Sequence, residues 1–185
     1  SSNLHTIEGN WIGLNAAGTT ASANAEQGLY ATTSTGNLIG GATAASRNVI
    51  AGNAQMGIYF DNVDNSLIAG NYVGTNAGGT GDVNGSTSNT LRSGIVLVNG
   101  SSGNTIGGTT AGARNVLSGN NHFGFEVIGA TSQNNVVVGN YIGTTYTGLA
   151  ALPNTNGGAS FWGSGAGNIV GGAIAYFLDP VADRL

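Results

Sequence analysis

A long sequence motif occurs twice in this chain, and the second copy repeats the first without a gap. Residues 103–120 read GNTIGGTTAGARNVLSGN, residues 36–53 read GNLIGGATAASRNVIAGN, and a shortened third copy starts at Gly167. A second motif alternates with the first, and its copies are GNWIGLN from Gly9, GNYVGTN from Gly70 and GNYIGTT from Gly139. The combined period is about 66 residues. A fixed period of this length indicates a repeat architecture in which each unit packs on its neighbours.

Each half of this period contains a glycine followed by a short alternating run. The runs start at Gly28, Gly57, Gly94, Gly124 and Gly158. The first and third residues after each glycine are apolar, which predicts a strand with one face in a core. Two further short apolar runs precede the next such glycine, and no helical apolar period is present. Three short strands in about 30 residues predict one coil of an all-β parallel β-solenoid.

The solenoid is expected to have about five coils. Residues 1–172 carry the repeats, as a two-coil unit of about 66 residues, whereas residues 173–185 drop them and are expected to form a tail or cap. The repeated asparagines are expected to stack at the corners and to bond along the axis. Two registers are predicted for them, one with Asn37, Asn104 and Asn168 and the other with Asn48, Asn115 and Asn135.

The composition excludes several classes of protein. Of 185 residues, 40% are hydrophobic and 6% are charged, with a net charge of −4, which does not fit a disordered chain. All four basic residues are arginines, too few to form a phosphate-binding face, so neither nucleic acid nor an anionic membrane is expected as a partner. There is no cysteine, and no apolar run reaches the roughly 18 residues of a membrane span. The equivalent Arg47 and Arg114 are expected to have structural roles, such as binding corner carbonyls.

The outward face of the glycine-led sheet carries much of the scarce charge. The residues expected there are Glu26, Gln55, Arg92, His122 and Asn156 two places before each glycine, Tyr30, Tyr59 and Glu126 two places after it, and Asp61 and Trp162 four places after it. An ordinary solvated face would have the same pattern. A functional interpretation makes Tyr30, Tyr59 and Trp162 platforms on which sugar rings stack.

A catalytic interpretation of this face rests on Asp61 and Glu126. They are two coils apart, about 9.6 Å along the axis, near the upper limit of about 9.5 Å for the carboxyl pair of an inverting glycosidase. Arg92 and His122 would then assist catalysis. Asp61 and Asp64 could also ligate Ca²⁺, although a turn rich in Asp and Asn hydrogen bonds is the favoured explanation of this segment. No cofactor is otherwise expected.

The two alternating motifs resemble those of secreted bacterial right-handed parallel β-helix proteins, in the surface-protein and adhesin branch of the pectate-lyase-like superfamily. The resemblance covers residues 5–172 and rests on structural Gly, Asn and Ile. It implies a right-handed parallel β-helix. No lyase catalytic pattern carries over, because those patterns use Lys or Arg bases and acidic Ca²⁺ clusters, and this chain has no Lys.

The expected function is a structural or adhesive module of a secreted or cell-surface bacterial protein, with a carbohydrate-contacting face on the glycine-led sheet. The alternative is a polysaccharide-degrading enzyme, a glycoside hydrolase or lyase. A third hypothesis, ice binding, is weakened because the threonine pairs fall in loops of unequal length and do not form one column. Expected partners are a polysaccharide or surface glycan, neighbouring repeats of a longer parent chain, and a second copy through end-to-end association.

Overall fold

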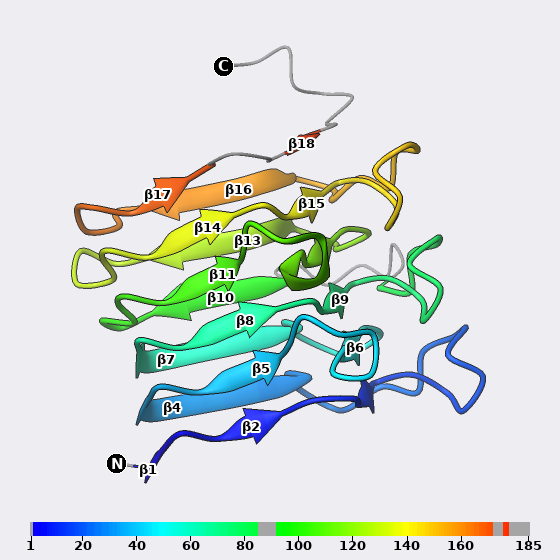
Figure 1. The fold of residues 1–185 in the computed structure, drawn as a ribbon, viewed down its shortest axis with the longest axis horizontal. Coiled ribbons are helices and arrows are strands. Elements are labelled where there is room, and N and C mark those ends of the chain that lie inside the picture. The colour runs from blue at the N-terminus through cyan, green and yellow to red at the C-terminus, as the bar shows by residue number, and fades with distance from the viewer. Residues whose placement is uncertain (1, 85–91, 172–175, 178–185) are drawn as a thin grey trace.

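The chain winds as a parallel β-helix, with its coils stacked one above another and the strands of successive coils side by side (Figure 1). The computed structural model describes residues 2–84, 92–171 and 176–177. These residues form three six-stranded sheets in which neighbouring strands are parallel, and three isolated antiparallel bridges lie in loops. The predicted all-β solenoid of about five coils is therefore confirmed.

The three sheets each take one strand from every coil. In spatial order, the first sheet contains β1 (Ser2–Asn3), β4 (Leu29–Thr35), β7 (Ile58–Asp64), β10 (Ile95–Val98), β13 (Phe123–Ile128) and β16 (Gly157–Trp162). The second contains β2 (Thr6–Ile7), β5 (Leu38–Gly40), β8 (Leu67–Ala69), β11 (Thr105–Gly107), β14 (Val136–Val138) and β17 (Ile169–Val170). The third contains β3 (Trp11–Ile12), β6 (Val49–Ile50), β9 (Tyr72–Val73), β12 (Val116–Leu117), β15 (Tyr141–Ile142) and β18 (Tyr176–Phe177). The described helical structure is one 3₁₀ turn, η1 (Ala111–Ala113).

The predicted core columns are present in the first sheet. The register aligns Leu29, Ile58, Ile95, Phe125 and Ala159 in one column, and Ala31, Phe60, Leu97, Val127 and Phe161 in the next. The interior members are fully buried, and each such side chain contributes about 1.5–3 kcal/mol by leaving water. Phe161 of the last coil is 42% exposed, although its ring packs edge-on against Phe125.

The glycine that opens each of these strands is required by close approach between coils. A Cβ atom added at Gly94 would lie 2.5 Å from the carbonyl oxygen of Gly124, and one at Gly57 would lie 2.7 Å from that of Gly94. Real Cβ atoms do not approach backbone oxygen this closely, so a side chain would push the coils apart. The repeated glycine in the sequence therefore marks the start of each strand of the first sheet.

Asparagine ladders run along two corners of the β-helix, as predicted, but the prediction places one residue, Asn135, in the wrong ladder. The corner before the second sheet contains His5, Asn37, Ser66, Asn104, Asn135 and Asn168. The corner before the third sheet contains Asn10, Asn48, Asn71, Asn115 and Asn140. The prediction that Asn135 joins Asn48 and Asn115 is wrong, because its Oδ1 accepts from the backbone N and the Nδ2 of Asn104.

A third ladder, which the sequence analysis does not predict, lies at the corner between the third sheet and the first. It contains Asn24, Asn53, Asn84, Asn120 and Asn154. Asn120 shows its chemistry: Nδ2 donates to Asn154 Oδ1 at 2.9 Å and to the Val73 carbonyl at 3.2 Å, while Oδ1 accepts from Asn84 at 2.8 Å. All three corners are thus bonded along the axis.

Loops of matched size protrude in every other coil. Loops 14–21, 75–82 and 144–151 are each closed by an antiparallel bridge between their end residues, and Figure 1 shows them projecting on the same side. We call these three loops the loop row. The Ala77 N–H donates to the Gly18 carbonyl at 2.8 Å, and the Tyr146 N–H to that of Gly79 at 2.9 Å. The alternation of coils with and without such a loop explains the two-coil period.

The predicted C-terminal tail lies mostly outside the described residues. Its described part is β18, which pairs with β15 and so extends the third sheet. Within the described residues, no helix is long and apolar enough to cross a membrane.

Replacing Asn71 by Ala is expected to destabilise the protein by about 3–5 kcal/mol. Asn71 is fully buried, accepts from both Asn48 nitrogens and donates to Asn115, so its loss strands several buried polar groups at about 1–3 kcal/mol each. Denaturant unfolding measures the change. Asn15→Ala, in an exposed loop, is the control and is expected to cost about 1 kcal/mol or less. Equal losses in the two variants would contradict the ladder's role.

Candidate functional site

The outward face of the first sheet is exposed at its two ends and buried in its middle. Tyr30 on β4 is 54% exposed and Trp162 on β16 is 76% exposed. Val96, Val98 and Glu126, on β10 and β13 between them, point outward by register but are at most 7% exposed. The expectation of a continuously solvated face is therefore wrong for the central strands, and the exposed face divides into two regions.

One exposed region is built on β4 and β7 around a pair of tyrosines. The register places Tyr30 beside Tyr59, and their ring centroids are 5.7 Å apart with the planes tilted by 33°. The Tyr30 hydroxyl donates to Asp61 Oδ2 at 3.4 Å, and the Asn99 side chain donates to Asp61 Oδ1 at 2.9 Å. We call Tyr30, Tyr59, Asp61 and Asn99 the tyrosine patch. It presents aromatic surface and hydrogen-bonding groups side by side.

The surroundings of the tyrosine patch raise the pKa of one of its residues, Tyr59. Burial raises the pKa of Tyr59 above its usual value, and the negative charge of Asp61 adds to the increase. Tyr59 therefore stays neutral and keeps its hydroxyl proton beside a carboxylate.

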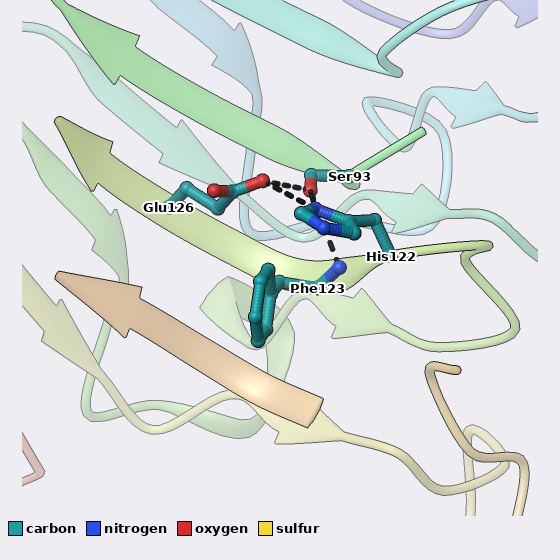
Figure 2. A network of polar contacts seen from close by, with 4 residues as sticks. All are labelled: Ser93, His122, Phe123 and Glu126. Atoms are coloured by element: carbon teal, nitrogen blue, oxygen red, sulfur yellow. Dashed lines mark hydrogen bonds and ion pairs between the residues drawn. The ribbon is translucent and has the colours of Figure 1, made fainter. Parts of the chain in front are cut away.

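A second polar cluster lies where β10 begins and β13 passes it (Figure 2). Glu126 Oε1 accepts from the Ser93 hydroxyl and lies 2.9 Å from His122 Nδ1, while the Ser93 oxygen accepts from the Phe123 N–H at 3.2 Å. We call Ser93, His122 and Glu126 the Ser93 cluster. Ser93 is fully buried and Glu126 is 5% exposed.

The Ser93 cluster differs from a serine hydrolase triad. In a triad the hydroxyl and the carboxylate contact different nitrogens of the histidine ring. Here Ser93 Oγ lies 3.1 Å from His122 Nδ1, the same atom that faces Glu126. Ser93 follows the connection between β9 and β10, so its contacts fix the end of that connection to β13. Sequence reasoning identified His122 and Glu126 and missed Ser93, which no motif marks.

The proposed carboxyl pair is held in two separate environments. Asp61, in the middle of β7, bonds to Tyr30 and Asn99. Glu126 lies two strands away and, by register, two residues nearer the amino ends of the strands, and it is engaged by His122, which precedes it by four residues. The two carboxylates thus bond to different partners and do not contact the same groups. Arg92 directly precedes Ser93, on the Glu126 side.

Trp162 lies apart from the tyrosine patch. It is in the same outward column as Asp61, three strands further along the axis, about 14 Å at the usual strand spacing. Val98 and Ile128 occupy the positions between. Of the three predicted platforms, Tyr30 and Tyr59 are brought together and Trp162 is not.

The predicted calcium ligands, Asp61 and Asp64, accept hydrogen bonds from other groups of the protein. Asp64 Oδ1 accepts from the Ser102 N–H at 2.9 Å, whereas Asp61 is bound by Asn99 and Tyr30. In the part of the chain that the structure describes, no three His, Cys, Asp or Glu side chains are grouped so that they could hold a metal ion.

Arg47 and Arg114 have the structural role expected of them. Arg47 Nε donates to the Gly70 carbonyl at 3.2 Å, and its guanidinium lies 4.1 Å from the centroid of the Tyr72 ring. Arg114 makes the same contacts with Gly139 and Tyr141 one repeat later. Both arginines thereby bind corner carbonyls beside the third sheet.

Comparisons with protein-family models, with curated proteins and with solved structures find no match for this chain.

Ser93→Ala is expected to lower the free energy of unfolding by about 1–3 kcal/mol, because it removes a buried donor to Glu126 and the acceptor of the Phe123 N–H. Urea titration measures the loss. Ser160→Ala is the matched control, since Ser160 is paired with Glu126 on the same outward face but is less buried. A Ser93 variant as stable as the wild type would show that the cluster does not anchor the connection.

Stability is expected to fall as the pH rises above 10.0. Burial raises the pKa of both Tyr59 and Tyr72, with Arg47 opposing the increase at Tyr72, so the unfolded chain loses these protons first. The stabilisation from the raised pKa is complete below pH 10.0 and is lost as the pH rises through the folded-state pKa. Chemical unfolding at a series of alkaline pH values measures the slope. Tyr59→Phe should make it shallower, and an unchanged slope would argue against a raised pKa at Tyr59.

Proposed function

We propose that this chain is a structural and adhesive β-helix module of a secreted or cell-surface bacterial protein of the pectate-lyase-like superfamily, and that it contacts carbohydrate through the tyrosine patch. The observation that carries the proposal is the exposed ring of Tyr30, which lies against the half-buried ring of Tyr59 beside the carboxylate of Asp61. The resemblance of the repeats supports the superfamily and the location.

The chemistry of the tyrosine patch suits a sugar ring. The apolar C–H face of a pyranose packs on an aromatic ring, while its hydroxyls need donors and acceptors at the ring's edge. Tyr30 supplies an accessible ring, and Asp61 and Asn99 supply oxygen acceptors and amide donors next to it. The patch is built on β-strands of a rigid solenoid, so a ligand needs little reorganisation of the protein to bind.

The alternative function, polysaccharide cleavage by Asp61 and Glu126, receives less support from the geometry. A carboxyl pair must flank one glycosidic bond. Glu126 is buried and bonded to His122 and Ser93, away from Asp61, which favours a binding module over an enzyme.

A glycan array and a reducing-sugar assay on the same sample test the proposal. We expect binding without release of reducing ends. Tyr30→Ala should weaken binding about 2- to 10-fold, corresponding to about 0.5–1.5 kcal/mol of aromatic contact. Glu126→Gln is the control for the catalytic alternative and should leave binding unchanged.

Release of reducing ends that disappears in Glu126→Gln would make the chain a polysaccharide-degrading enzyme and overturn the proposal. Absence of any glycan binding would also overturn it and leave a purely structural module.

A further inference from the structure

The charge around the tyrosine patch has one sign. Asp61 lies within the patch, and Asp64 follows on the same strand. Arg47 and Arg114 are bound to carbonyls at the start of β9 and β15, beside a different sheet. Arg92 precedes β10 by three residues, whereas Asp61 is paired with Val98 at the end of that strand. Among the described residues, therefore, the basic side chains lie away from the patch and its local charge is negative.

The tyrosine rings and the carboxylate of the patch both attract cations. The face of a tyrosine ring carries negative electrostatic potential and binds ammonium groups, by about 0.5–1 kcal/mol at exposed sites. A carboxylate forms stronger hydrogen bonds with an ammonium group than with a neutral hydroxyl. Asp61 is partly exposed, and its Oδ2 is held by the longer of its two hydrogen bonds, at 3.4 Å from the Tyr30 hydroxyl. That oxygen is the one a ligand can engage at least cost.

From this arrangement we infer that the tyrosine patch selects glycans carrying free amino groups, as in a glucosamine polymer, over neutral and acidic glycans. The inference rests on the proposed carbohydrate-binding function and specifies its ligand. The ammonium group binds Asp61 Oδ2, and the sugar ring to which it is attached packs on Tyr30. A uronate or a sulfated sugar would place a negative charge beside Asp61 and is rejected.

A cationic peptide would meet the same carboxylate but uses the aromatic surface less fully. A lysine places its ammonium group at the end of a flexible chain, whose ordering opposes binding. An amino sugar carries the ammonium directly on a rigid ring of a size that suits one tyrosine. The exposed ring of Tyr30 next to Asp61 therefore favours the sugar.

Calorimetric titration with four defined oligomers tests the inference. The probes are a glucosamine hexamer, an N-acetylglucosamine hexamer, a galacturonate hexamer and hexalysine, each with the full chain at low salt and mildly acidic pH. We expect the glucosamine hexamer to bind at least 10-fold more tightly than its acetylated counterpart, and the galacturonate hexamer to bind most weakly. Added salt should reduce the preference, since the ammonium contact is screened.

Two variants separate the roles of charge and ring. Asp61→Asn keeps the size of the side chain and an oxygen acceptor for Asn99, and it should abolish the preference for the free amine while leaving binding of the acetylated hexamer. Asp82→Asn, in the loop row, removes the same net charge elsewhere and should preserve the preference. Tyr30→Ala should weaken both sugar hexamers.

The outcomes distinguish this inference from the function on which it rests. If the two glucosamine-based hexamers bind equally and both depend on Tyr30, the carbohydrate-binding function stands and the amine selectivity is wrong. If no oligosaccharide binds, both are wrong. Hexalysine binding as tightly as the glucosamine hexamer would also overturn the inference and identify the patch as a site for basic peptides.

Discussion

The structure depends on hydrogen bonds that run along its axis through buried asparagine side chains. Each coil turns three corners, and at each corner the backbone N–H and C=O groups leave the hydrogen bonds that they make within a sheet. A carboxamide has both donors and an acceptor, so one asparagine can bond to the coil above and below in the same way at every level. Asn71 illustrates this, because it joins Asn48 on one side to Asn115 on the other while holding the Ile39 carbonyl. The ladders fix the register, and the register in turn aligns the core columns.

Periodic features of this fold could be predicted from the sequence, because the same residue pattern recurs in every coil. The columns that begin at Leu29 and Ala31 follow from the spacing to each glycine, and the structure confirms them. The assignment of Asn135 was wrong because the valine after it resembles the context of Asn48 and Asn115, whereas its neighbours on the ladder are Asn104 and Asn168. A ladder position is defined by its place in three dimensions, and the residue that follows an asparagine does not determine it.

Features that occur once were harder to predict. The Ser93 cluster needs a serine at the end of a long connection to meet two residues of the next coil, and no repeat marks that contact. The burial of Val96 and Val98 is of the same kind, since alternation assigned them to the outward face but could not say how open that face is. By contrast, Tyr30, Tyr59 and Asp61 come together because two successive coils place them in adjacent columns, and the sequence already put them there. A candidate site on a solenoid is thus predictable where it is built by stacking, and not where it depends on a loop.

The loop row restricts how a chain of this kind can change in length. The loops occur in every second coil, and each bonds to the one two coils away through the backbones of Gly18, Ala77, Gly79 and Tyr146. Insertion of a single coil would place a loop-bearing coil against the wrong neighbour and break this contact, whereas insertion of a pair would preserve it. Gene duplication can therefore lengthen the helix only in units of two coils. Under that rule the tyrosine patch could be copied at intervals along a filament, which would give many weak contacts a combined avidity.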